Sequence, residues 1–187
     1  MKYPLVGMIA ALCLFTAPTA SATTWNVDHT KSRLGFTVQW SGEAFNATFK
    51  SWNAAIVFDP ADLAHSKVVA TVDLKSEDSG SDENDDGVKG AEGFATDKFP
   101  TAKFETTGFA ANGGASYVAS GRLTLHGITR PMTLPFTLTI NRNTAHMIAK
   151  AVVSRIDFGL GHGEWASESP IAHAVTITID LTATKAH

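Results

Sequence analysis

Apolar and polar side chains alternate along several stretches of this chain, and no other sequence feature constrains its fold as strongly. The clearest stretch covers residues 33–40, where the apolar positions are Leu34, Phe36, Val38 and Trp40. The same two-residue period recurs in residues 68–74, 132–140 and 175–181. A period of two places neighbouring side chains on opposite faces of a strand, so these segments are predicted to be β-strands with one buried face.

Other stretches extend this pattern over most of the chain. Further strands are predicted at residues 25–28, 102–107, 117–125 and 146–156, which are separated by turn signals such as Asn112-Gly113-Gly114. In residues 45–58 the apolar positions change from odd to even near Lys50-Ser51, which predicts a bulge or a sharp bend. A short helix is expected in the loop around residues 86–93. Eight or nine strands at this spacing predict an all-β domain, either a sandwich or a barrel.

The first 22 residues have the composition of an export signal rather than of a strand. Lys2 precedes an uncharged apolar run from Leu5 to Phe15, and Ala20-Ser21-Ala22 follows as a small-residue cleavage site. This order of parts predicts a cleavable signal peptide over residues 1–22 and one folded domain over residues 23–187. The apolar run is too short to span a bilayer, and no later stretch is longer, so no transmembrane segment is expected. The product is expected in the periplasm or outside the cell.

Charge and cysteine content exclude several classes of function. The chain carries 15 Lys and Arg against 18 Asp and Glu, a net charge of −3, so it lacks the basic excess of a nucleic-acid-binding protein. The single cysteine, Cys13, lies in the predicted signal. The mature domain therefore has no disulfide, catalytic thiol or zinc–thiolate site. We expect no cofactor and no catalytic residue, because the chain has neither a G-x-S-x-G nor an H-E-x-x-H motif, and the H-x-E at His162 lacks the P-C-x-x-C of zinc deaminases.

An acidic run, Asp82 to Gly87, matches the first half of a calcium-binding loop. Position twelve of such a loop is a glutamate that binds the ion with both oxygens, but here it would be Gly93. We therefore interpret the run as a solvated acidic loop and expect no metal site.

The apolar faces of the predicted strands carry most of the aromatic residues. Such residues could simply fill the core of a sandwich. Alternatively, an eight-stranded closed barrel has an interior that can hold one small ligand. The export signal and the long, bent, aromatic strands favour an apolar ligand pocket as the functional interpretation.

Five segments, taken in order, resemble motifs of the YceI-like family, whose members resemble lipocalins and bind polyisoprenoids or other long-chain amphipathic lipids. The motifs are W-x-x-D-x-x-x-S at residues 25–32, an aromatic segment ending in F-D at 45–59, F-P-x-x-x-F at 99–104, G-x-L-T-x-H-G-x-T at 121–129 and R-x-D-F-G-x-G at 155–161. The resemblance covers essentially all of residues 24–183. It implies an extended, eight-stranded antiparallel β-barrel with a hydrophobic tunnel, and family members can pair as homodimers.

The resemblance also implies the function, namely binding of a long-chain isoprenoid or another amphipathic lipid by a non-enzymatic carrier. The residues predicted to line the tunnel are Phe36, Val38, Trp40, Phe45, Phe49, Trp52, Ile56, Phe94, Phe104, Leu123, Leu125, Phe136 and Leu138. Two alternatives remain open: a small hydrolase or isomerase acting on such a lipid, and a structural β-module that binds protein partners. A polar cluster inside the tunnel would favour the first, and a filled core the second.

Three polar residues, His126, Arg155 and Asp157, are candidates for a structural role or for contact with a lipid head group. Arg155 and Asp157 are two residues apart in a predicted strand, so an ion pair of Arg155 with Asp157 or Asp28 is the structural interpretation. His126 is expected in the turn after residues 117–125. The family commonly carries an Arg-Asp pair in the long loop, where this chain is acidic; this favours a neutral head, such as a quinone or an amide, over a pyrophosphate.

Overall fold

The computed structural model describes residues 22–161 and 163–186. The predicted signal, residues 1–22, lies outside this range except for Ala22. None of the helices in the described ranges is both long and apolar enough to cross a membrane.

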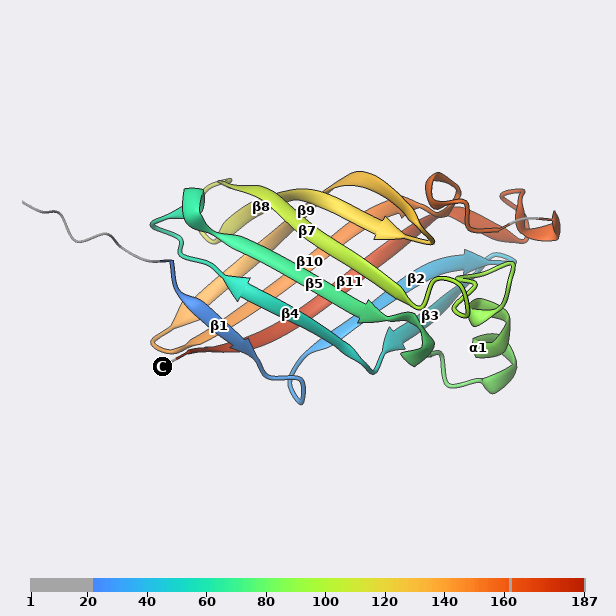
Figure 1. Cartoon of the computed structure of the whole chain (residues 1–187), viewed down its shortest axis with the longest axis horizontal. Helices are drawn as coiled ribbons and strands as arrows, with labels where there is room; N and C mark the ends of the chain where they lie inside the picture. Colours follow the sequence, from blue (N-terminus) through green and yellow to red (C-terminus); the bar gives the residue numbers. More distant parts are fainter. Residues whose placement is uncertain (1–21, 162, 187) are drawn as a thin grey trace, which may run out of the picture.

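The described chain is built almost entirely of β-strands, as the alternation predicted, and they are inclined to the long axis of a barrel (Figure 1). The strands are β1 (Thr24–Val27), β2 (Arg33–Trp40), β3 (Glu43–Phe49), β4 (Trp52–Val57), β5 (Lys67–Asp73), β6 (Glu77–Asp78), β7 (Thr101–Ala111), β8 (Ser116–Leu125), β9 (Ile128–Asn141), β10 (Thr144–Ser154) and β11 (Ile171–Lys185). The described chain has one α-helix, α1 (Asp82–Lys89). Its four single-turn 3-10 helices are η1 (Leu63–His65), η2 (Leu74–Ser76), η3 (Arg155–Phe158) and η4 (Gly163–Trp165).

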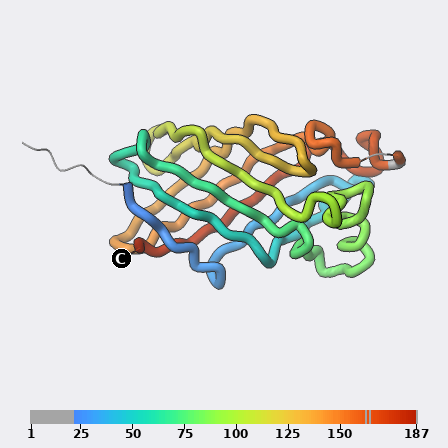
Figure 2. The backbone as a smooth tube through the Cα atoms, in the orientation of Figure 1, coloured from blue at the N-terminus to red at the C-terminus, as the bar shows by residue number. Residues whose placement is uncertain are grey.

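Antiparallel pairing closes the strands into a barrel. The order is β1-β4-β5-β7-β8-β9-β10-β11, and β1 pairs with β11 to complete the ring of eight (Figure 2). At the other end β2 takes the place of β1 beside β11, β3 continues β4, and β6 continues β5. The predicted eight-stranded antiparallel barrel is therefore confirmed.

The bend predicted near Lys50-Ser51 is confirmed, because β3 ends at Phe49 and β4 begins at Trp52. The change of phase keeps the apolar side chains of both strands inside the barrel: Phe45 and Phe49 face inward from β3, and Trp52 and Ile56 from β4. A bend between two inward-facing segments lets one long strand follow the curvature of the wall.

The helix and the predicted strand over residues 146–156 have different bounds in the structure. The helix covers Asp82–Lys89 rather than residues 86–93, because acidic side chains are favourable in the first turn of a helix, where the backbone N–H groups are unpaired. The strand predicted over residues 146–156 ends at Ser154, and Arg155 begins η3.

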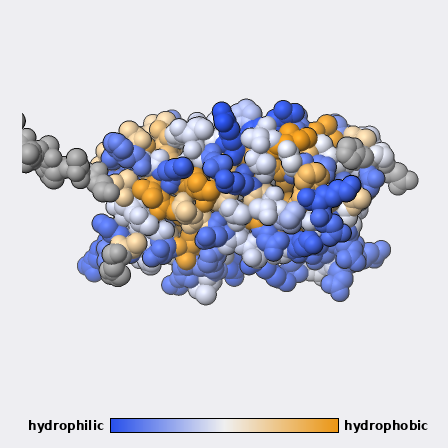
Figure 3. Space-filling model, viewed as in Figure 1, coloured by the Kyte–Doolittle hydropathy of each residue, from blue (hydrophilic) through white to orange (hydrophobic). Residues whose placement is uncertain are grey.

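The outside of the barrel is mostly hydrophilic, with small hydrophobic patches on the face shown in Figure 3. Inside, buried apolar residues gather in three clusters along the barrel. The cluster at the end of the barrel away from α1 (Figure 1) is organised by Trp25, whose indole N–H donates to the carbonyl oxygen of Phe58 at 2.9 Å. The middle cluster contains the small residues Ala119, Ala149 and Ala151.

Candidate functional site

A cavity of about 310 Å³ follows the interior of the barrel, and its wall is almost entirely apolar. On β10 the wall includes both Ala145, next to the turn before the strand, and Val153, near its far end. Eight residues of strand span ~26 Å, so the cavity is long rather than round. A cavity of this shape suits an extended hydrocarbon chain.

All thirteen residues predicted to line a tunnel lie on the wall of this cavity. They are Phe36, Val38, Trp40, Phe45, Phe49, Trp52, Ile56, Phe94, Phe104, Leu123, Leu125, Phe136 and Leu138. Twelve of them are strand residues, and an inward-facing position in a closed barrel faces the cavity by necessity; Phe94 comes from the loop after α1. Their contact with a ligand stays a prediction.

Several wall residues were not foreseen. Trp25, Phe58, Phe109 and Trp165 also line the cavity, so all four tryptophans of the chain face it. Trp165 belongs to η4, in a stretch without alternation, and no sequence pattern indicated that this turn folds back over the end of the barrel. Its ring lies 6.0 Å from that of Trp40.

Small side chains on the inner face create the space that the aromatic rings leave. Alanines line the cavity at Ala70, Ala102 and Ala119, on three different strands. Gly121 also faces inward: a Cβ there would lie 2.7 Å from the ring of Phe104, so the ring can lie flat against the backbone only because the residue is glycine. The cavity therefore results from pairing large residues with small ones around the ring.

Aromatic side chains close the end of the barrel nearest α1. Phe36 is in contact with Phe45, Phe49 and Phe94, with ring centroids 5.8–6.1 Å apart. Phe94 comes from the loop after α1, whereas the other three rings come from β2 and β3. Tilted ring pairs at such distances are favourable, so this cluster attaches the loop to the barrel wall.

Arg155 makes no ion pair of the predicted kind. Its Nε donates to Ala172 O at 3.1 Å, Nη1 to Leu160 O at 3.0 Å, and Nη2 to Ser167 O and Ile171 O at 2.8 and 2.9 Å. Burial lowers the pKa of this guanidinium. The predicted partners Asp157 and Asp28 lie elsewhere, because η3 turns the chain and Arg155 and Asp157 do not share the side of a strand. Arg155 instead gathers the backbone carbonyls of the loop between η3 and β11.

Gly161 makes the position of Arg155 possible. A Cβ on Gly161 would lie 1.9 Å from Nη1 of Arg155, and its φ of 87° is a conformation that favours glycine. The R-x-D-F-G-x-G segment therefore encodes a folded turn around one buried guanidinium.

The other two polar candidates lie near the β8–β9 turn. His126 and Gly127 form this turn, with φ of 51° and 74°, as expected for His126. The Nδ1 of His126 is 3.2 Å from Phe158 O, and its ring packs on Phe99 at 4.4 Å. Asp157 is exposed, and its carbonyl oxygen accepts a hydrogen bond from Arg130 Nε.

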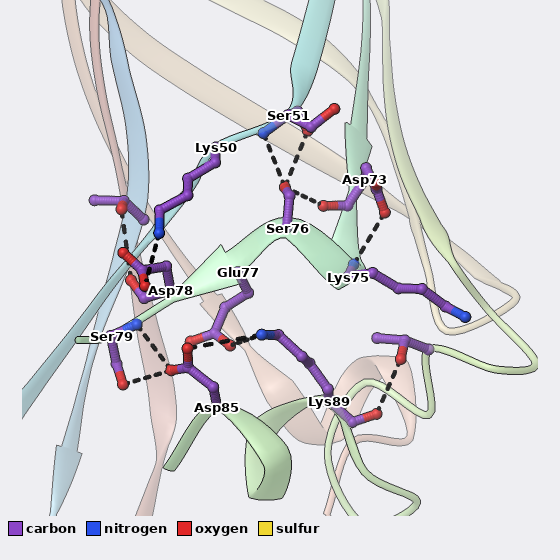
Figure 4. Close-up of polar contacts among 12 residues, drawn as sticks. Lys50, Ser51, Asp73, Lys75, Ser76, Glu77, Asp78, Ser79, Asp85 and Lys89 are labelled. Atoms are coloured by element: carbon purple, nitrogen blue, oxygen red, sulfur yellow. Dashed lines mark hydrogen bonds and ion pairs between the residues drawn. The ribbon is translucent and has the colours of Figure 1, made fainter. Parts of the chain in front are cut away.

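Glu77 is a buried acid that the sequence did not indicate. It is opposite Phe49 in the β3–β6 pair, is 2% exposed, and neither carboxylate oxygen has a hydrogen-bond donor (Figure 4). Lys89 Nζ lies 3.9 Å from it and 3.7 Å from Asp85, whose Oδ1 accepts bonds from the backbone and hydroxyl of Ser79. Burial and the neighbouring Asp85 charge raise the pKa of Glu77 to about 7.

No group of three or more His, Cys, Asp or Glu side chains able to hold a metal ion occurs among residues 22–161 and 163–186. The acidic run that resembled half a calcium loop forms α1 instead.

An antiparallel barrel of eight strands closed around an apolar cavity has the architecture of barrels that enclose a small ligand, as lipocalins do. This chain belongs to the YceI-like family, whose domain matches residues 25–183. Protein YceI of Shigella flexneri is 31% identical over 137 residues, which are 72% of this chain and 71% of that protein. A UPF0312 protein of Photorhabdus laumondii is 33% identical over the same shares of the two chains.

Solved structures show the same fold. BcnA of Burkholderia cenocepacia aligns with a TM-score of 0.82 at 31% identity, covering 85% of this chain and 100% of that chain. A polyisoprenoid binding domain from Saccharophagus degradans aligns with a TM-score of 0.67 at 16% identity, covering 88% and 99% of the two chains.

The role of Arg155 can be tested by Arg155→Lys. An ammonium cannot reach the four carbonyls that the guanidinium binds, so we expect the free energy of unfolding to fall by about 2–3 kcal/mol in urea titrations. Arg130→Lys is the control, since Arg130 is exposed and binds one carbonyl; it should change stability by no more than about 0.5 kcal/mol. Equal losses in the two variants would contradict the role assigned to Arg155.

Glu77 should make folding pH-dependent. Its pKa is raised from 4.5 to about 7, so the folded state binds the proton more tightly and stability falls as the pH rises from about 4.5 to about 7. The loss amounts to at most about 3 kcal/mol and should be absent from Glu77→Gln, measured by urea unfolding at pH 5 and pH 8. Glu83→Gln, on the exposed side of α1, should keep the wild-type slope. A Glu77→Gln variant with that slope would show that another group titrates.

Proposed function

We propose that this protein is an exported, non-enzymatic carrier that sequesters a long-chain amphipathic lipid in its barrel. The lipid would be a polyisoprenoid, an isoprenoid quinone or a fatty-acid derivative. The observation that carries the proposal is the long apolar cavity, lined by aromatic, aliphatic and small side chains from every part of the ring. A structural β-module would instead have a filled core.

Burial of a hydrocarbon chain supplies the binding energy without any specific polar contact. Each buried methylene contributes ~0.8 kcal/mol, so ten methylenes contribute about 8 kcal/mol before the cost of ordering the chain. The length of the cavity would then select the ligand by the length of its hydrocarbon chain. The side chains at the α1 end of the cavity would select its head group.

The charges at the α1 end favour a neutral head group. Glu92 lines the cavity there, Asp85 belongs to α1, and Glu77 lies on β6 next to that helix. Arg155 also reaches the wall, but its guanidinium donates hydrogen bonds to four backbone carbonyls. An anionic head would therefore meet acidic side chains and a guanidinium already bound to the loop.

Binding and release, rather than catalysis, fit the polar groups of the wall. The hydroxyl of Thr106 donates to Val68 O at 3.2 Å, and Lys103 pairs with Glu105 at 3.1 Å. These side chains and Arg155 are engaged in holding the barrel together. The likeness to a domain described as polyisoprenoid binding supports the same conclusion at the level of the fold.

The proposal includes export. The composition of residues 1–22 supports a cleavable signal, residues 23–187 would form the carrier domain, and the periplasm or the exterior would be its site of action. A long-chain lipid needs a carrier protein to cross such an aqueous compartment, because its hydrocarbon chain is poorly soluble in water.

All-trans-retinol, an isoprenoid alcohol that accepts energy from tryptophan, provides a direct test because all four tryptophans face the cavity. We expect saturable energy transfer with wild type and a Kd raised at least about tenfold in Ala119→Phe, whose ring takes the space of several ligand methylenes. Ser120→Phe, on the outer face of the same strand, is the matched control and should bind as wild type does. Absence of retinol binding, and of any long-chain lipid in extracts of the natively purified protein, would refute the proposed function.

A further inference from the structure

The wall of the barrel lacks its backbone ladder along part of one strand pair. β9 and β10 pair from their turn to Phe136–Ala149, and the pairing stops there. Both strands continue: β9 stays paired with β8 as far as Ile128, and β10 with β11 as far as Ser154. We call the unpaired part, residues 130–135 of β9 and 150–154 of β10, the seam. β9 arches at this end of the barrel in Figure 1.

Two prolines account for the break. Continued in register, the pair would set Pro135 opposite Lys150, Thr133 opposite Val152 and Pro131 opposite Ser154. The two-residue turn after Asn141 makes that residue, and every second one before it, exchange hydrogen bonds with β10. Positions 135, 133 and 131 follow this rule, and a proline has no N–H to donate. Two of the three donors that β9 would direct at β10 are therefore missing.

Side chains, not hydrogen bonds, close the seam. Met132, Leu134 and Val153 line the cavity directly behind it, and Met132 and Val153 pack against the same apolar cluster. On the outside, Val152 of the seam is 68% exposed, and Ile148 and Ile156, which flank the seam along the chain, are 46% and 38% exposed. Apolar residues thus lie on both sides of the unpaired wall.

The two ends of the seam are held. At one end the ladder resumes at the Phe136–Ala149 pair. At the other, Arg130 Nε donates to Asp157 O at 3.1 Å and joins β9 to η3. Strands fixed at both ends and unpaired between them can separate locally without unravelling the barrel.

We propose that the seam is a lateral portal through which the hydrocarbon chain of the lipid enters and leaves the cavity. The proposal rests on the lipid-binding function proposed above. Parting the strands here breaks side-chain contacts but no ladder hydrogen bond, whereas passage through the α1 end must displace the aromatic cluster of Phe36, Phe49 and Phe94. The exposed apolar side chains of β10 and η3 give the emerging chain a surface to contact.

A crosslink across the seam tests this proposal. Residues 23–187 contain no cysteine, so Thr133→Cys/Val152→Cys introduces a single pair of thiols, and a disulfide between them would hold the two strands of the seam together. The rate of energy transfer from tryptophan to all-trans-retinol after rapid mixing reports loading. We expect oxidation to slow loading and release at least about tenfold, because other routes require breaking ladder hydrogen bonds or the aromatic cluster, and reduction to restore both rates.

Thr139→Cys/His146→Cys is the matched control, since this pair lies on the same two strands where the ladder is intact. Its oxidation should change the rates less than about twofold, because that part of the wall is already closed by hydrogen bonds. Pro131→Thr/Pro135→Thr tests the same point without a crosslink: restored donors should extend the ladder and slow exchange. Wild-type rates in both the oxidised seam pair and the proline variant would overturn the portal.

The experiment separates this proposal from the proposed function. If the portal is wrong and the carrier function right, retinol binds every variant at equilibrium and all rates match wild type. If the carrier function is wrong, retinol binds neither the wild type nor any variant, and the portal proposal is then also refuted.

Discussion

Closure of the backbone ladder through β1 and β11 is the constraint on which the rest of this structure depends. β1 is only four residues long, yet it pairs with β4 on one side and β11 on the other and so leaves the ring without an edge there. A closed ring fixes which face of every strand points inward. The cavity, its aromatic wall and the inward position of Glu77 all follow from that closure, and so does the tolerance for a local break between β9 and β10.

The interior is divided by side-chain size. Aromatic rings gather toward the two ends, around Trp25 and Phe58 at one and Phe36 and Phe94 at the other. Between the ends, alanines and Gly121 occupy inward positions beside Phe104, Phe109 and Phe136, so these rings do not fill the middle of the barrel. Interiors are normally packed without voids, and a void of this length is unfavourable unless something fills it. An apolar occupant removes that cost, which is why folding and binding are linked in such a barrel.

Much of the fold was predictable because strand alternation is local. The bend near Lys50-Ser51 is visible as a change of phase, and twelve of the thirteen wall residues follow from inward parity, Phe94 of the loop after α1 being the exception. The R-x-D spacing predicts a strand and an ion pair at Arg155, but residues 155–158 form a helical turn in which Arg155 binds backbone carbonyls instead. Glu77 left no signal, since two residues are too few to show a period. Pro131 and Pro135 are visible in the sequence, but their effect depends on which neighbouring strand, β8 or β10, their missing N–H groups would face.

By itself, the sequence determined the strands, their inner faces, the export signal as a prediction and the family, because periodicity and motifs are properties of neighbouring residues. Only the tertiary structure decided how far the inner faces stand apart, which buried groups lack partners and where the wall is unpaired. Those are relations between residues far apart in the chain, such as Glu77 with Lys89, Arg155 with the carbonyls before β11, and β9 with β10. They arise when the ring closes, and no local pattern contains them.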